Sequence, residues 1–155
     1  MFINGIGAIS PQLTEVTGNT VLQNPIDYQG DRLSCIEPDY PTYIDPRHLR
    51  RMSRILKMGV AASVMALREA GVMSPDGIIT GTGYGCLEDT GIFLRKMIDH
   101  REQALSPTPF IQSTHNTIGS QIALILNCQG YNQTYTHEGL SFETSLLDAM
   151  STWFG

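Results

Sequence analysis

Short apolar runs alternate with longer amphipathic stretches along this chain, and the two patterns predict different elements. Residues 2–10, 77–80 and 133–137 read as strands; the first two are apolar runs with few polar residues, as in strands buried on both faces. Apolar residues recur at helical spacing in four stretches: residues 45–70, 117–126 and 141–153, and a stretch that begins near Glu88. Strands that alternate with helices predict an α/β fold with a mostly parallel core sheet flanked by helices.

The clearest helix is predicted over residues 45–70. Asp45 can cap free amides, Pro46 fits a first turn, and Gly71 is a natural stop. Residues 60–67 are apolar nearly all round, which predicts deep burial. Two stretches without such periodicity are interpreted as loops: a long polar connection over 12–43, with room for a short hairpin, and a proline-rich loop over 106–110.

The length of 155 residues fits one domain, yet the three predicted strands make a small sheet and the chain stops just after a helix. A parallel sheet normally continues from there into another strand. We therefore expect residues 1–155 to be part of a larger fold.

Charge and cysteine content limit the partners and the compartment. The formal net charge of −5 argues against nucleic acid, because phosphate binding needs a cationic surface. No secretory signal is visible, and no apolar run is long enough to span a bilayer. Three cysteines without a CxxC pair fit reduced thiols, so we expect a cytoplasmic protein with no membrane partner.

The sequence predicts neither a metal nor a cofactor. The four histidines lack metal-ligand spacing, and the turn at 81–85 lacks the spacing of nucleotide-binding loops, so close backbone packing is its default interpretation. Cys35, Cys86 and Cys128 lie where nothing activates a thiolate.

A basic strip gathers half of the ten cations within eleven residues: Arg47, Arg50, Arg51, Arg54 and Lys57. One interpretation is a solvated helix face. The other is a docking surface for an acidic partner. The sequence leaves both open.

Residues 134–141 are predicted to end a strand, turn sharply and begin a helix. Helix N-terminal amides at such a junction stabilise a thiolate or an oxyanion. The side chains on offer here are His137, Glu138 and Ser141. Ser141 is interpreted as a helix cap rather than a nucleophile. His137 could act as a base toward the Ser141 hydroxyl only if the two side chains point toward each other.

Four segments, in order, resemble the β-ketoacyl synthase family of thiolase-like enzymes. Residues 1–11 (MFINGIGAISP) are similar to its opening strand, and residues 45–71 to its R-R-M-D-R helix. Residues 77–85 (GIITGTGYG) are similar to its glycine turn, and residues 113–132 to the helix and turn before its nucleophile strand. The resemblance implies a thiolase-like lobe that is incomplete in this chain, a partial N-terminal domain over 1–155.

The family nucleophile motif T-A-C-x-S-[SG] places Ser141 on the serine, Ala149 on a later alanine and Gly139 on the catalytic cysteine. A covalent acyl-enzyme cannot form on a glycine. The family's other catalytic groups, two histidines and a lysine, belong to a C-terminal half that this chain does not contain. Family members without the cysteine resemble chain-length factors, although those usually carry glutamine where this chain has Gly139.

The resemblance therefore implies a homologue of fatty-acid or polyketide-type biosynthesis that acts as a non-condensing partner subunit. Its partners would be a catalytic ketosynthase, or a second copy, and an acyl carrier protein, with dimer contacts through the strand at 133–137. One alternative is an active synthase or acyltransferase that uses Ser141 with His137. The other is an inactive fragment.

Overall fold

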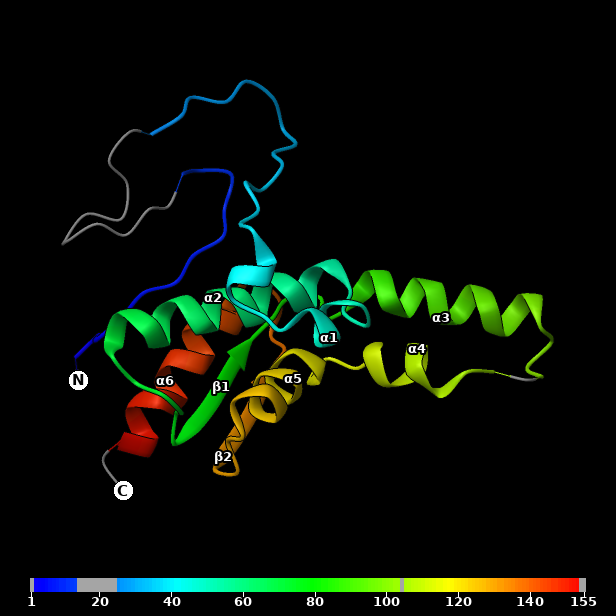
Figure 1. Ribbon diagram of the computed structural model, residues 1–155. Coiled ribbons are helices and arrows are strands. Elements are labelled where there is room, and N and C mark those ends of the chain that lie inside the picture. Colours follow the sequence, from blue (N-terminus) through cyan, green and yellow to red (C-terminus); the bar gives the residue numbers. More distant parts are fainter. Residues whose placement is uncertain (1, 14–24, 104, 154–155) are drawn as a thin grey trace. The chain divides into compact units, whose positions relative to one another are not determined.

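The computed structural model describes residues 2–13, 25–103 and 105–153, except for the side chain of residue 153. The chain divides into two compact units, an N-terminal unit formed by Phe2–Met73 and a C-terminal unit formed by Ser74–Gly155. Figure 1 shows the helices and strands of both.

The N-terminal unit contains the 3-10 helix η1 (Tyr40–Thr42) and the helices α1 (Pro46–Leu49) and α2 (Arg54–Ala70). The predicted ends are confirmed. Asp45 accepts a hydrogen bond from the Arg47 amide at 2.8 Å, and Gly71 ends α2 with a left-handed φ of 68°.

The prediction of one continuous helix over 45–70 is wrong. The amides of Arg51 and Met52 donate to carbonyls only three residues back, which tightens the end of α1. Ser53 then adopts an extended conformation (ψ 168°) from which α2 starts afresh.

The predicted strand over 2–10 is also wrong, since this segment is extended but joins no sheet. Gly5 and Gly7 lie so close to α2 that a Cβ atom would meet the carbonyl oxygens of Ala66 and Ala62 at 2.2 and 1.9 Å. The Ile6 amide donates to the Glu69 carboxylate of α2 instead of to a neighbouring strand. A helix therefore takes the place that a second strand was expected to fill.

Burial along α2 is less complete than predicted. Within 60–67 only Val60 and Ala61 are buried, and Ala62 and Ala66 are half-buried beneath the thin extended segment. The expected hairpin does not form within residues 25–43, which contain η1 and irregular backbone. The rest of the predicted connection, 14–24, lies outside the described residues.

The C-terminal unit is built on strands β1 (Gly77–Gly81) and β2 (Tyr131–Tyr135), which pair in parallel with Gly77 opposite Tyr131 and Gly81 opposite Tyr135. The sheet therefore has two strands in the described part of the chain, not three. β2 begins two residues before the predicted range of 133–137. The predicted α/β class with a parallel sheet is confirmed.

Five helical segments accompany the sheet: α3 (Leu87–Asp99), α4 (Pro107–Gln112), α5 (Thr117–Leu126), the 3-10 helix η2 (Glu138–Leu140) and α6 (Ser141–Trp153). Helices α5 and α6 both contact the two strands. The helices predicted over 117–126 and 141–153, and the one that begins near Glu88, are confirmed.

The proline-rich stretch at 106–110, predicted as a loop, instead begins α4. Pro107 stands in the first turn, where its fixed φ suits a helix and its missing N–H costs nothing. Phe110 of α4 packs against Phe93 of α3 with ring centroids 5.5 Å apart. This contact between elements was not visible in the local sequence.

No helix in the described ranges is long and apolar enough to cross a membrane.

Candidate functional site

The carboxyl ends of β1 and β2 lie at one edge of the sheet, and a turn follows each strand (Figure 1). The Thr82 amide donates to the Tyr135 carbonyl at 2.9 Å, so the turn after β1 stays attached to the end of β2. The turn after β2 then leads through η2 into α6. This edge is the candidate functional site.

Ser141 holds the two turns together. Its side chain is buried, with 4% exposure, and its Oγ accepts a hydrogen bond from the His137 amide at 2.9 Å. The hydroxyl hydrogen can be donated to the carbonyl of Glu138 at 2.8 Å or of Thr82 at 3.0 Å. These partners belong to the turns, whereas a capping serine binds amides of its own helix, so the structure corrects the predicted cap to a clamp between turns.

His137 reaches Ser141 through its backbone and not through its ring. The hydrogen bond is donated by the His137 amide, and in the described structure none joins the imidazole to Ser141 Oγ. A serine activated by histidine needs that side-chain bond. The geometry therefore brings the two residues together without pairing them as nucleophile and base.

Gly139 lies in η2, just before α6, and is exposed. Apart from its two chain neighbours, no described residue would have an atom within 4 Å of a Cβ atom at this position. The preceding residue, Glu138, has a left-handed φ of 46°, which is uncommon for a residue other than glycine. The turn is thus strained at Glu138 and open at Gly139.

The glycine turn after β1 is tight, as predicted. A Cβ atom on Gly81 would lie 2.5 Å from the Ser141 carbonyl oxygen, and Gly85 has a φ of 58°. Thr82 Oγ1 accepts a hydrogen bond from the Gly85 amide at 2.9 Å. Sequence reasoning missed Thr82, although a hydroxyl residue between two glycines is a signal for a side chain that bonds its own loop.

The cysteines offer no activated thiol at this edge. Cys86 is buried, with 1% exposure, and burial, assisted by the nearby Asp89 carboxylate, raises the pKa of its thiol to about 11. Cys35 and Cys128 are half-buried free thiols. Among the described residues no group of three or more His, Cys, Asp or Glu side chains is placed to hold a metal ion.

The basic strip is partly neutralised within the chain. Arg47 pairs with Asp45 at 2.7 Å, and the hydrogen bonds from Arg47 lower the pKa of Asp45 to about 2. Arg54 pairs with Glu37 at 2.5 Å. A hydrogen bond from Tyr40, followed by that from Arg54, lowers the pKa of Glu37.

The remaining cations of the strip are placed differently. Arg50 and Arg51 are exposed between α1 and α2, while Lys57 is half-buried on α2. The strip is therefore not one continuous row of unpaired cations. Arg50 is an exposed cation of the strip that no ion pair among the described residues engages.

A family model for the N-terminal domain of β-ketoacyl synthases matches residues 27–137, well over half of the chain. The chain belongs to the β-ketoacyl synthase family. Its fold matches a ketosynthase in complex with its chain length factor from Xenorhabdus doucetiae, with a TM-score of 0.66 and 21% identity over 96% of this chain. It also matches the ishigamide ketosynthase/chain length factor, with a TM-score of 0.62 and 21% identity over 86% of this chain.

The chain spans 60% and 38% of the lengths of these two structures. At this level of identity the similarity defines the thiolase-like fold. A search among curated proteins finds no significant match.

Proposed function

We propose that this chain is a non-condensing partner subunit, of chain-length-factor type, for a cysteine-bearing ketosynthase of fatty-acid or polyketide-type biosynthesis. The observation that carries the proposal is Gly139. The family motif places this residue at the nucleophile position, and it offers only an open space before α6. Condensation by this family passes through a covalent acyl-enzyme, which needs a nucleophilic side chain there.

The neighbouring groups do not replace the missing thiol. The Ser141 hydroxyl is buried and bonded to backbone groups of both turns. The Cys86 thiol is buried and, with a pKa of about 11, stays neutral at physiological pH. Glu138 would be a poor nucleophile toward a thioester.

The direct test is intact-mass spectrometry after incubation with acyl-carrier-protein and acyl-CoA thioesters. We expect no stable adduct on the chain. A stoichiometric acyl adduct that disappears in Ser141→Ala would overturn the proposal in favour of an acyltransferase that uses Ser141 and His137.

Restoring the family nucleophile gives a second test. Gly139→Cys should fold, because no described residue other than its chain neighbours lies within 4 Å of the new Cβ atom. It should add a thiol that iodoacetamide modifies. Helix N-terminal amides lower a thiol pKa, so it should react faster at neutral pH than the thiol of Ser151→Cys in the last turn of α6. We expect no condensation by residues 1–155 alone, since the histidines and lysine of the family are not among them.

The proposed partners are a catalytic ketosynthase or a second copy of this chain, and an acyl carrier protein. The ketosynthase or second copy would be joined through strand β2, and all partners would be in the cytoplasm. The two solved relatives are ketosynthases with chain length factors, which supports a ketosynthase partner. Co-expression with a cysteine-bearing ketosynthase of the family should yield a stable complex. Separate elution of the two chains at micromolar concentration would count against the proposal.

An acidic carrier protein would be held by the basic strip. We expect its binding to weaken steeply with salt and to be lost in Arg50→Glu, because Arg50 is exposed and no ion pair within the described residues engages it. Arg54→Glu is a less clean variant, since it also breaks the ion pair with Glu37. The matched control is Lys96→Glu, an exposed cation on α3. Equal binding by Arg50→Glu and the control would reduce the strip to a solvated face.

A further inference from the structure

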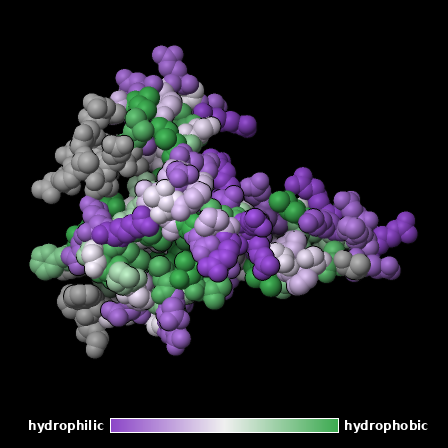
Figure 2. All heavy atoms as spheres, viewed as in Figure 1, coloured by the Kyte–Doolittle hydropathy of each residue, from purple (hydrophilic) through white to green (hydrophobic). Residues whose placement is uncertain are grey.

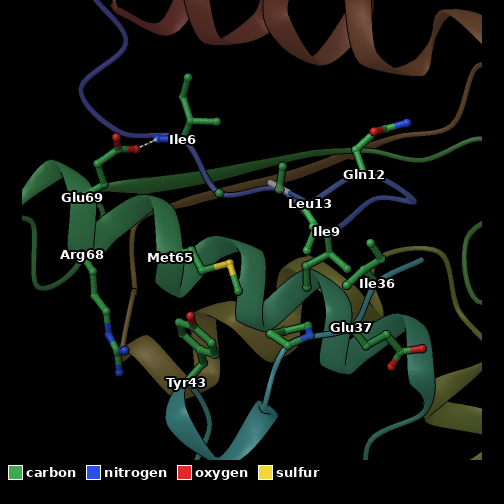
Figure 3. A pocket seen from close by; sticks show the side chains of 13 residues that line it. Ile6, Ile9, Gln12, Leu13, Ile36, Glu37, Tyr43, Met65, Arg68 and Glu69 are labelled. Carbon is green, nitrogen blue, oxygen red and sulfur yellow. Dashed lines mark hydrogen bonds between the residues drawn. The ribbon is translucent and has the colours of Figure 1, made fainter. Parts of the chain in front are cut away.

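The N-terminal unit contains a hollow of about 560 Å³ that the proposed function does not use (Figure 3). Three parts of this unit line it: the extended segment 6–13, the loop 36–43 and helix α2. Small-molecule sites are typically concave spaces of about 300–1,000 Å³. The size of the hollow is therefore that of a ligand pocket.

The interior of this pocket is apolar. Ile6, Ile9 and Leu13 come from the extended segment, Ile36 from the loop and Met65 from α2. Figure 3 shows the side chains of Ile9, Leu13 and Ile36 gathered in the middle of the hollow. Ile6, Leu13 and Ile36 all count among the exposed large apolar residues, so this wall is still open to water. Covering it would be favourable by the hydrophobic effect.

Gln12, Glu37 and Glu69, three polar side chains of the pocket, are already bonded to the protein. The side-chain amide of Gln12 forms two hydrogen bonds with the backbone of Ile26. Its Nε2 donates to the Ile26 carbonyl at 2.9 Å, and its Oε1 accepts from the Ile26 N–H at 2.7 Å. The Glu69 carboxylate accepts from the Ile6 amide at 2.5 Å (Figure 3). Glu37 is held by Arg54 at 2.5 Å and by the Tyr40 hydroxyl at 2.7 Å.

Arg68 is likewise engaged, at the end of the pocket beside Tyr43. Its Nη2 donates to the Thr42 carbonyl at 2.8 Å, and its guanidinium lies 5.0 Å from the centre of the Tyr43 ring. Arg68, the single cation among the lining residues, is thus bonded to groups within the unit. These same bonds attach the irregular segments to one another and to α2, which holds the pocket open in advance of any ligand.

We propose that this pocket binds a small, neutral molecule with an aliphatic body. Apolar side chains supply the contact area, and each charged group of the lining already holds a hydrogen bond within the unit. A charged head group entering the pocket would lose its hydration without gaining a free partner, which is costly. The proposal stands independently of the function proposed for the nucleophile turn.

The test is an NMR titration of the chain labelled at its methionine methyl groups. The probes are 1-octanol, octanoate and octylamine, which share one alkyl chain and differ in head-group charge. We expect 1-octanol to shift the Met65 methyl resonance saturably, with the two charged probes binding more weakly. Met73, which is 92% exposed, reports any non-specific association.

Met65→Trp should fill the pocket and weaken 1-octanol binding by about tenfold or more, whereas Met73→Trp should leave it unchanged. Circular dichroism verifies that both variants fold. If one does not, the titration of the unsubstituted chain still tests the proposal. An unmoved Met65 resonance, an equal shift at Met73, or tighter binding of octanoate than of 1-octanol would overturn the proposal.

Discussion

Two glycines at the edge of the sheet differ in what an added side chain would meet. A Cβ atom on Gly81 would lie 2.5 Å from the backbone oxygen of Ser141, while one on Gly139 would meet no described residue within 4 Å other than its chain neighbours. Gly81→Ala should therefore destabilise the chain by about 1–3 kcal/mol, as overpacking commonly does. Gly139→Ala is the matched control and should change the free energy of unfolding little. Urea unfolding measures both, and equal effects would contradict the geometry.

The three cysteines should differ in reactivity. Cys86 is buried and its thiol pKa is raised to about 11, whereas Cys35 and Cys128 are half-buried. In the native chain a thiol reagent at pH 8 should modify Cys35 and Cys128 well before Cys86, with full labelling on unfolding. Quantitative labelling followed by peptide mass spectrometry reads this out. Early modification of Cys86 would mean that its burial is not maintained in solution.

The same thiol carries a pH dependence. Because the pKa of Cys86 is higher in the folded chain than its ordinary value of 9.0, the protonated thiol favours the folded state. Its contribution is complete below pH 9 and is lost as the pH rises through about 11. In Cys86→Ala the fall in stability across this window should be smaller than in the unsubstituted chain, as measured by urea unfolding at several pH values.

At the scale of elements, the junction between the turn after β1 and the start of α6 depends on one hydroxyl. Ser141→Ala would leave the His137 amide without its partner and would remove the bond to the Thr82 carbonyl. The loss of a buried hydrogen bond of this kind should cost about 1–3 kcal/mol. Ser151→Ala removes an exposed hydroxyl from the same helix and should cost far less. Thermal unfolding compares the two, and similar melting temperatures would contradict a clamping role for Ser141.

Elements that depend on local signals were predictable from the sequence. The start of α3 follows Glu88 and Asp89, which suit a helix N-terminus, and α6 follows its apolar spacing. Cys86 was interpreted as unactivated because it lies just before the acidic helix start at Glu88 and Asp89, and its thiol pKa is indeed raised, by burial and by the Asp89 carboxylate.

Elements that depend on distant partners were not predictable in the same way. Residues 2–10 have the composition of a buried strand, but Gly5 and Gly7 let the segment lie directly on α2. The break between α1 and α2 has no proline or glycine to announce it. The bond from Ser141 to Thr82 joins residues 59 positions apart, and no periodicity encodes such a pair.

At the scale of the whole molecule, the C-terminal unit leaves more large apolar side chains open than it buries. Its buried apolar residues among those described are Ile78, Cys86, Ile118 and Ile122. Figure 2 shows apolar side chains at the surface around α5, where Leu124 is 70% exposed. Large open apolar patches on soluble proteins usually mark contact surfaces or aggregation sites.

Helix α6 carries the most regular of these surfaces. Phe142, Leu146 and Met150 follow each other at intervals of four residues, which places them on one face, with exposures of 70%, 38% and 41%. The side chains of residues 153 and 154, which are also apolar in the sequence, lie outside those that the structure describes. We therefore expect the exposed apolar stripe of α6, formed by Phe142, Leu146 and Met150, to mediate association.

We predict that the chain forms a dimer or a higher oligomer at micromolar concentration, because covering this stripe removes apolar surface from water. Replacing Phe142 and Met150 together by glutamate should shift the equilibrium toward monomer, since each carboxylate would have to be desolvated in the contact. Met73→Glu is the control, because Met73 is an exposed apolar residue of the other unit. Sedimentation velocity over a range of concentrations measures the outcome. A clean monomer with a sharp cooperative melt would show that the stripe does not drive self-association, and contact with a ketosynthase would then be expected through strand β2 alone.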